Sequence, residues 1–405
     1  MVPKEEWIFF LHQLFMVLLI TGYCDCTLSK SSKKVKKEQH EIINEVSGPL
    51  KESVAERELV TDALKWKDVV EQHKGYLPAA SSSKAATLAY VTPWNNRGYD
   101  IAKWQGGRFS HVSPVWLQLK PLRDQNTESR WQVTGLQDVD QGWLTQVRNS
   151  ARKVARTTKI VPRIIFEGWG AGEFQALVES AALRRQLAQD LLSLIQSEQF
   201  DGLVLEVWSQ LPTRSLLGSM PSVIAPVADT LRAAGYIVIL VIPPAVYQGK
   251  TEGFFLAEQF QALSPHVDFF SLMSYDYSSL QNPGPNSPLW WMKECVEKIE
   301  PDQDSPNRAK ILLGLNLYGI DHSSTGGGHV LGQQYVEILR KHKPKIQYDD
   351  ISAEHFFEYT SDGRRTVFYP SLYSLQQRVL LAKNLNTGIS LWEIGQGLDY
   401  FYDLF

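Results

Sequence analysis

The sequence predicts an α/β protein that folds as a (β/α)8 TIM barrel, and two observations support this prediction. From residue 85 to the C-terminus, eight short apolar runs alternate with longer amphipathic stretches. Strands buried on both faces of a sheet read as continuous apolar runs, and their alternation with helices is typical of a parallel barrel. An open doubly wound sheet is the alternative. The number of runs, and the absence of a glycine-rich phosphate loop after the first run, favour the barrel.

The apolar runs give the expected strands in chain order. They are Thr87–Thr92, Val112–Leu119, Ile160–Phe166, Leu203–Val207, Ile237–Ile242, Phe269–Tyr275, Ile311–Leu317 and Gly388–Trp392. Helical patterns between them include Glu173–Glu198, Ser222–Ala234, Leu331–Lys341 and Ser371–Leu385. A short irregular insert is expected before the last strand, because two short runs flank the hairpin turn Ser361-Asp362-Gly363.

The chain begins with a targeting segment. Trp7 to Gly22 is almost uninterrupted apolar sequence that is too short, and too close to the start, to favour a membrane span. Residues 1–26 are therefore expected to be a cleaved signal peptide and the protein to be secreted, with an uncleaved signal anchor as the alternative. Residues 27–84 form a polar N-terminal segment that is expected to be partly helical, and residues 85–405 form the barrel.

The composition excludes several classes of protein. The net charge of −3 gives no reason to expect nucleic acid as a partner. Three cysteines, Cys24, Cys26 and Cys295, cannot build a disulfide scaffold, and neither Cys nor His shows metal-ligand spacing. We therefore expect no metal and no cofactor. Each of the 12 Trp needs a partner for its indole N–H, so some are expected to line a cleft rather than the core.

Function in a barrel of this type is expected at the carboxyl ends of the strands. In this chain, aromatic side chains and a few carboxylates gather there. Such a rim suits a sugar, because pyranose rings have apolar faces and hydroxyl edges, and ligand sites combine apolar walls with a few polar groups. The alternative for each aromatic residue is that it fills the core. The candidate saccharide-binding residues are Trp94, Trp116, Trp169, Glu206, Trp208, Tyr275, Asp276, Tyr318 and Trp392.

Four of these strand ends resemble glycoside hydrolase family 18, the chitinases and chitinase-like lectins. Met273-Ser274-Tyr275-Asp276 looks like the family's Met-x-Tyr-Asp segment, and Gly388–Trp392 looks like its last strand, whose Trp lies beneath the central sugar. Leu313–Gly319 fits strand seven. Glu167-Gly168-Trp169 fits the Gly-Gly-Trp after strand three, although Glu167 stands where the family usually has Gly. The resemblance covers about residues 85–405 and implies the same barrel.

The fourth strand departs most from the family. The catalytic signature Asp-x-x-Asp-x-Asp-x-Glu aligns with residues 201–208, where Asp201 matches. Val204 and Glu206 stand at the second and third Asp positions, and Trp208 replaces the terminal Glu. The resemblance implies that this Glu protonates the leaving oxygen, whereas an indole has no titratable proton near neutral pH. We therefore expect an inactive homologue, a non-catalytic saccharide-binding lectin, rather than an enzyme.

The resemblance also implies ligands and partners. It implies chitooligosaccharides or bacterial lipopolysaccharide as ligands, a role in innate immunity, and a stabilin-type scavenger receptor as partner. It implies a lysosomal as well as a secreted location. No stretch after residue 26 approaches the length of a membrane span, so we expect no stable span. The unusual fourth strand and the closing residues Trp392 to Asp403 carry this part of the resemblance.

Two other functions stay open. The chain is a weak hydrolase if Glu167 or Glu393, both near strand ends, supplies a displaced acid within reach of the leaving oxygen. Otherwise Glu167 is a rim residue paired with Arg or Lys. The chain is a protein-interaction module that has lost sugar binding if Trp208 packs against Trp392 and occludes the cleft. The sequence leaves open whether Trp208 opens or blocks it.

Overall fold

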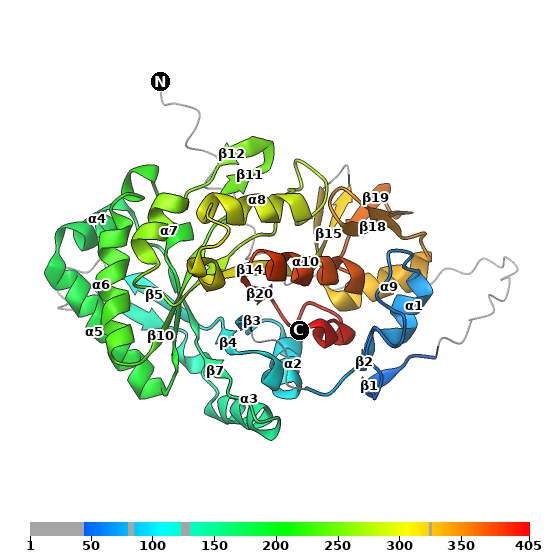
Figure 1. Ribbon diagram of the computed structural model, residues 1–405, viewed down its shortest axis with the longest axis horizontal. Coiled ribbons are helices and arrows are strands. Elements are labelled where there is room, and N and C mark those ends of the chain that lie inside the picture. The colour runs from blue at the N-terminus through cyan, green and yellow to red at the C-terminus, as the bar shows by residue number, and fades with distance from the viewer. Residues whose placement is uncertain (1–43, 80–84, 123–129, 324–325) are drawn as a thin grey trace, which may run out of the picture. The chain divides into compact units, whose positions relative to one another are not determined.

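The expected parallel barrel is present (Figure 1). The computed structural model describes residues 44–405 except 80–84, 123–129 and 324–325. The strands of its main sheet are β3 (Thr87–Val91), β4 (His111–Pro114), β5 (Leu117–Pro121), β6 (Trp131–Thr134), β7 (Lys159–Ile160), β8 (Arg163–Phe166), β9 (Gly202–Glu206), β10 (Ile237–Ile242), β13 (Phe269–Leu272), β14 (Ile311–Asn316) and β20 (Gly388–Trp392). Their order is β6-β5-β8-β9-β10-β13-β14-β20-β3-β4-β7. Neighbours are parallel except β5 and β6, which form a hairpin.

Two of the expected strands are each broken once, and the breaks lie opposite each other. β4 pairs with β7 and β5 pairs with β8, so the sheet closes on itself through the two broken strands. Between the paired positions Val112–Ile160 and Leu117–Ile164, the first strand advances five residues and the second four. This extra residue is a β-bulge. It turns Trp116 to the outer face, where Leu117 also lies, while Val115 faces the barrel interior.

Helices surround the barrel, as Figure 1 shows. They are α2 (Asn96–Gln105), α3 (Gln141–Lys153), α4 (Ala171–Glu179), α5 (Ala181–Glu198), α6 (Met220–Ala233), α7 (Ala257–Leu263), α8 (Leu289–Ile299) and α10 (Leu372–Asn384). The helix expected over Glu173–Glu198 is two helices. Ser180 separates them because its hydroxyl accepts the N–H of Leu183 at 3.2 Å, which starts a new helix.

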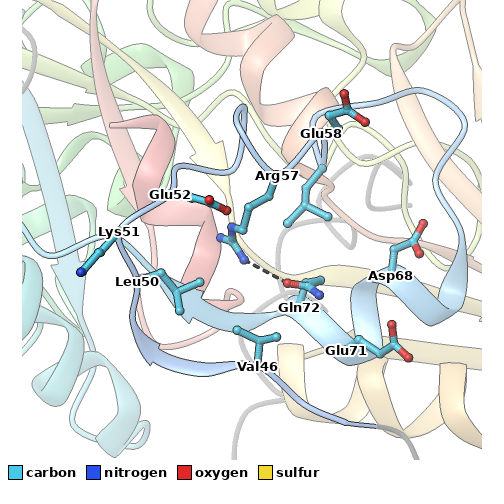
Figure 2. A pocket seen from close by; sticks show the side chains of 10 residues that line it. Val46, Leu50, Lys51, Glu52, Arg57, Glu58, Asp68, Glu71 and Gln72 are labelled. Atoms are coloured by element: carbon cyan, nitrogen blue, oxygen red, sulfur yellow. Dashed lines mark hydrogen bonds between the residues drawn. The ribbon is translucent and has the colours of Figure 1, made fainter.

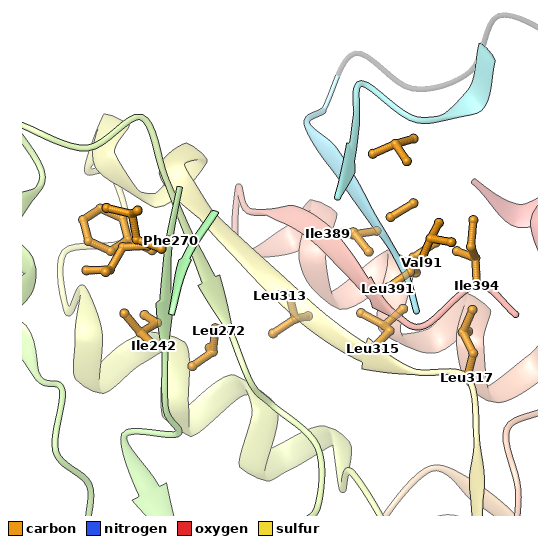
Figure 3. Close-up of a cluster of buried hydrophobic side chains, with 14 of the residues drawn as sticks. Val91, Ile242, Phe270, Leu272, Leu313, Leu315, Leu317, Ile389, Leu391 and Ile394 are labelled. Atoms are coloured by element: carbon orange, nitrogen blue, oxygen red, sulfur yellow. The ribbon is translucent and has the colours of Figure 1, made fainter. Parts of the chain in front are cut away.

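Both faces of the barrel strands are buried, as the continuous apolar runs predict. Leu313 and Leu315 of β14 and Leu391 of β20 belong to the layer between strands and helices (Figure 3). Leu312 of β14 belongs to a second cluster inside the barrel, together with Tyr90 of β3. The interior is therefore a packed core and not a pore, so a ligand site must lie at the strand ends.

The insert before the last strand differs from the short irregular one expected. It is a five-stranded antiparallel sheet of β15 (Gly319–Ser323), β16 (Gly326–Val330), β17 (Gln347–Asp349), β18 (Glu354–Thr360) and β19 (Arg364–Phe368), with α9 (Gly332–His342) between β16 and β17. The hairpin at Ser361-Asp362-Gly363 is confirmed, since it joins β18 to β19. Asp362 and Gly363 take the positive φ angles, 47° and 112°, that such a turn requires. We call these five strands the small sheet.

The described part of the N-terminal segment packs on the C-terminal end of the chain. β1 (Ser47–Pro49) and β2 (Lys74–Tyr76) form a two-stranded parallel sheet, with α1 (Trp66–Gln72) between them. The N–H of Leu77 donates to the Asp403 carboxylate at 2.7 Å. The expected signal peptide, residues 1–26, lies outside the described residues. Of the helices that the structure describes, none is both long and apolar enough to cross a membrane.

Candidate functional site

Trp392 forms the floor of the barrel mouth, at the carboxyl end of β20. Asn316 of β14 is its register partner. The indole meets the ring of Tyr90 edge-on with centroids 5.1 Å apart, and the Tyr90 hydroxyl donates to Ser271 at 2.8 Å. Trp392 also packs on the interior cluster but is only half-buried. Part of its ring is therefore available at the strand ends, where the sequence places a sugar.

Tyr275, Asp276 and Tyr318 form a polar group on one side of the mouth. The Tyr318 hydroxyl donates to Asp276 Oδ1 at 2.5 Å, and the rings of Tyr275 and Tyr318 meet edge-on at 6.4 Å. Burial raises the pKa of both phenols well above the ordinary range, so they stay neutral hydrogen-bond donors. Asp276 itself is exposed. The structure thus brings these three predicted residues together and leaves a carboxylate facing solvent.

Glu206 lies at the end of β9 and is paired with an arginine that the sequence interpretation missed. Arg163 Nε lies 2.8 Å from Glu206 Oε2, and the Ser209 hydroxyl donates to Oε1 at 3.0 Å. The side chains of Arg163 and Glu206 are 13% and 15% exposed. The signal in the sequence was a charged residue inside the apolar run Ile160–Phe166. A guanidinium and a carboxylate therefore stand side by side in the barrel mouth.

Trp116 and Trp169 were expected to extend the cleft, but both belong to the core. Trp116 is fully buried, and its indole N–H donates to the Tyr99 hydroxyl at 2.6 Å. Trp169 is also buried, and its N–H donates to the Leu119 carbonyl at 2.8 Å. Each indole has thus found its polar partner within the protein. Neither ring offers a face to a ligand in this structure.

Trp208 is also core, and it neither extends nor blocks the mouth. Its exposed fraction is 1%, its N–H donates to the Phe254 carbonyl at 2.9 Å, and its ring packs edge-on against Phe255 at 5.0 Å. The chain leaves β9 in a short 3-10 turn that begins at Trp208, so the side chain joins the outer layer rather than the interior. Trp208 was predicted as a saccharide-binding residue, but its buried ring offers no face to a ligand, and it packs on Phe255 rather than on Trp392.

Trp94 is the most exposed of the predicted aromatic residues, with 59% of its surface accessible. The next residue, Asn95, donates to Glu393 Oε1 at 2.6 Å, which ties the segment after β3 to the residue that follows Trp392. Glu393 is fully buried, and burial raises its pKa from 4.5 to about 7 although the Gly395 N–H and Asn95 hydrogen bonds oppose the shift. Trp94 is thus held beside the end of β20.

Glu167 has the surroundings of an ordinary rim residue. Its side chain is 51% exposed and lies 3.5 Å from the Lys120 ammonium. This is the pairing with Lys or Arg that we expected if Glu167 were not a displaced acid.

Two hollows lie away from the strand ends. One of about 730 Å³ opens beside β1 and α1, where Glu52, Glu58, Asp68 and Glu71 surround apolar side chains and Arg57 donates to Gln72 at 3.2 Å (Figure 2). Another of about 500 Å³ lies between the small sheet and α9. Within the described part of the chain, no three His, Cys, Asp or Glu side chains are grouped to hold a metal ion. We therefore identify the candidate site by the aromatic and carboxylate groups at the barrel mouth, and not by pocket volume.

Comparison with known proteins finds bacterial relatives that match part of the chain. The cortical fragment-lytic enzyme of Bacillus subtilis is 29% identical over 177 residues, and that of Bacillus anthracis is 28% identical over 172 residues. These matches cover 41% and 40% of this chain and 40% and 39% of the relatives. The chain thus matches only about two fifths of the length of these relatives.

Solved structures share the fold over most of the chain. A chitinase from Chromobacterium violaceum superposes with a TM-score of 0.64 at 20% identity, covering 79% of this chain and 97% of that chain. The spore cortex-lytic enzyme SleL of Bacillus megaterium gives 0.62 at 17% identity, covering 79% and 74%. A family 18 chitinase variant from Cycas revoluta, solved with (GlcNAc)4, gives 0.60 at 16% identity, covering 79% and 98%. The model of the glycosyl hydrolases family 18 matches residues 86–397, and the chain therefore belongs to that family.

Proposed function

We propose that this protein is a non-catalytic member of its family that binds saccharides, a chitinase-like lectin for chitooligosaccharides. The observation that carries the proposal is the position of Trp208. It stands where the resemblance places the proton-donating Glu, it is buried, and its only polar atom is bonded to the Phe254 carbonyl. An indole cannot act as a general acid near neutral pH, and loss of general acid catalysis costs about 10²–10⁴ in rate.

The two predicted carboxylates at the mouth act as hydrogen-bond acceptors. Glu206 accepts from the Ser209 hydroxyl and lies against the Arg163 guanidinium, and Asp276 accepts from the Tyr318 hydroxyl. A carboxylate that accepts these hydrogen bonds retains lone pairs for further donors. Both groups are therefore suited to accept hydrogen bonds from sugar hydroxyls or amides.

The aromatic residues that stay accessible supply the apolar part of the site. The half-buried ring of Trp392 provides a floor, and the exposed ring of Trp94 extends the surface beyond it. Glu206 ends β9 and Asp276 follows β13, so both carboxylates lie at the same end of the barrel as Trp392. Apolar contact combined with a few placed polar groups is the usual form of a ligand site.

Calorimetric titration with chitooligosaccharides of increasing length, with a parallel assay for released sugar, tests the proposal. We expect affinity to rise with length and no sugar to be released. Trp392→Ala should weaken binding about 30-fold, because a buried aromatic anchor contributes ~2 kcal/mol. Trp104→Ala is the matched control, since Trp104 is 38% exposed but stacks on Tyr76 of β2. Unchanged affinity of Trp392→Ala would contradict the site.

A weak hydrolase with a displaced acid is the second candidate. The observation in its favour is the pKa of Glu393, about 7, because a carboxyl with this pKa holds a proton near neutral pH. Cleavage of chitooligosaccharides that disappears in Glu393→Gln or in Glu167→Gln supports this candidate and overturns the lectin. Absence of both binding and cleavage at every length supports a protein-interaction module instead.

We further propose secretion and a lysosomal location, bacterial lipopolysaccharide as a second ligand, a role in innate immunity, and a stabilin-type scavenger receptor as partner. The support is the resemblance of residues 200–208 and 392–403 to the stabilin-interacting chitinase-like protein, whereas the curated relatives reported above are bacterial. Surface plasmon resonance with a purified stabilin ectodomain tests the partner. No binding at micromolar concentration would remove it.

A further inference from the structure

The segment that carries Asp276 is fixed by a buried ion pair outside the barrel strands. Glu354, the first residue of β18, and Arg378 of α10 have side chains that are 9% and 3% exposed, and Arg378 Nη2 lies 3.1 Å from Glu354 Oε1. Both side chains reach the backbone between β13 and α8. Separating a buried ion pair is costly, because it leaves an uncompensated charge. The backbone groups that are hydrogen-bonded to Glu354 and Arg378 are therefore held in position.

Three hydrogen bonds join the ion pair to residues 286 and 287. Glu354 Oε2 accepts the Asn286 N–H at 3.0 Å, and Glu354 Oε1 accepts the Ser287 N–H at 2.6 Å. Arg378 Nη2 donates to the Ser287 carbonyl at 2.6 Å. The Ser287 hydroxyl also donates to Asn316, the register partner of Trp392, at 2.8 Å. Glu354 therefore accepts both backbone N–H groups, and Arg378 binds the Ser287 carbonyl.

The next link leads directly to the candidate site. Asn286 is 1% exposed, and its Oδ1 accepts the N–H of Asp276 at 2.8 Å. Asp276 has a φ of 61°, a left-handed conformation that is uncommon for residues other than glycine and needs support from its surroundings. The Asp276 carboxylate then meets the Tyr318 hydroxyl. The chain of contacts thus runs from Glu354 through Asn286 to the backbone and side chain of Asp276.

We propose that Glu354 and Arg378 are positioning residues for saccharide binding, which hold Asp276 in its left-handed conformation through Asn286. This inference rests on the proposed lectin function, because Asp276 is taken as a sugar contact. Glu354 and Arg378 are themselves buried and act through the backbone of Asn286 and Ser287. The small sheet, through β18, therefore takes part in shaping the barrel mouth.

A double-mutant cycle with chitohexaose as the probe tests this proposal by calorimetry. Glu354→Gln and Asp276→Asn should each weaken binding about tenfold, and the double variant should be no weaker than either single one. This non-additivity is a coupling of about tenfold, or ~1.4 kcal/mol. Additive losses, or a folded Glu354→Gln variant with wild-type affinity, would overturn the proposal.

Asp268→Asn is the matched control. Asp268 precedes β13 as Asp276 follows it, and it accepts from Arg232 at 3.0 Å and from the Val238 N–H at 2.9 Å at the opposite end of the barrel. It should lower stability without changing affinity, and its effect should add to that of Asp276→Asn. If Glu354→Gln fails to fold, Asn286→Ala removes the last link while the ion pair stays, and it should show the same affinity loss.

Amide hydrogen exchange separates this proposal from the lectin function. Exchange of the Asp276 N–H should accelerate in Glu354→Gln and in Asn286→Ala, but not in Asp268→Asn, with or without a sugar present. If wild type binds no chitohexaose while this pattern holds, the lectin proposal fails and the anchoring of Asp276 stands. Unchanged exchange at Asp276 in both variants would overturn the anchoring whatever the sugar does.

Discussion

The residues that follow the fourth and sixth barrel strands, β9 and β13, differ in polarity and in exposure to solvent. After β9, the position aligned with the family's proton donor holds Trp208, which packs on Phe255 within the outer core. After β13, Asp276 is exposed and has a left-handed backbone conformation, and its carboxylate accepts a hydrogen bond from the Tyr318 hydroxyl. The position of Trp208 after β9 is thus apolar and buried, whereas the position of Asp276 after β13 is polar and exposed.

Trp208 and Asp276 also differ in what stabilises them. Trp208, which follows β9, is stabilised by apolar packing, and the Phe254 carbonyl accepts its indole N–H. An exposed Asp with a positive φ needs the network around Asn286. This network holds a solvent-facing carboxylate in one position, as a ligand site requires.

We expect the largest change in the free energy of unfolding from a carboxylic acid introduced at position 208, after β9. Trp208→Glu removes a large buried ring and buries a carboxyl among apolar groups, so the free energy of unfolding should fall by about 4 kcal/mol or more. We expect no gain of chitinase activity. Urea unfolding and a reducing-sugar assay measure the two quantities.

Trp290→Glu is the control for this change, because Trp290 is 43% exposed and should tolerate a carboxylate within about 0.5 kcal/mol. A stable Trp208→Glu variant that cleaves chitooligosaccharides would contradict this prediction. It would show that a side chain at position 208 can reach a substrate in the barrel mouth.

A second effect concerns the buried carboxyl after β20. The pKa of Glu393 is raised from 4.5 to about 7, so the folded protein binds this proton more tightly than the unfolded chain does. The resulting stability is present in full below pH 4.5 and is lost as the pH rises through 7, by roughly 3 kcal/mol in total. Glu393→Gln should lack this decline between pH 4.5 and 8 in urea unfolding.

Glu167→Gln, at an exposed rim carboxylate paired with Lys120, should retain the pH dependence of the wild type. If Glu393→Gln and wild type lose the same stability between pH 4.5 and 8, then Glu393 is not the source. The pKa of Glu393 would then not be raised as burial predicts.

Periodicity predicted the barrel because each strand is apolar on both faces, as Leu312 and Leu313 of β14 illustrate. The same reasoning missed most of the small sheet. The paired segments Gly319–Ser323 and Gly326–Val330 contain four glycines, several polar residues and only two β-branched residues, Ile320 and Val330, so their pattern does not predict a strand. β15 lies between β16 and β19 and pairs with both.

The sequence predicted the position of Trp392 at a strand end, because β20 runs without a break to this residue. Prediction failed where the backbone changes direction. A bulge turns Trp116 outward, and a 3-10 turn does the same to Trp208. The anchoring of Asp276 was invisible in the sequence, because Asn286 and Glu354 are separated by 68 residues.

The smallest effect compares two similar hydrogen bonds. Tyr318 donates to Asp276 at the mouth, and Tyr359 donates to Asp321 Oδ2 at 2.8 Å in the small sheet. Removing a hydroxyl that is bonded to a carboxylate costs about 1.5 kcal/mol in either place, so Tyr318→Phe and Tyr359→Phe should lower the free energy of unfolding by similar amounts.

Only Tyr318→Phe should weaken chitooligosaccharide binding, by about five- to tenfold, because Asp276 then loses the donor that orients its carboxylate toward the ligand. Calorimetry on both variants separates orientation from stability. If the two variants bind equally well, the Tyr318 hydroxyl contributes to the fold alone, and the polar character of the mouth after β13 must come from the Asn286 link. If both bind more weakly, the small sheet acts on the mouth as a whole, and the contrast between strand ends extends into the insert.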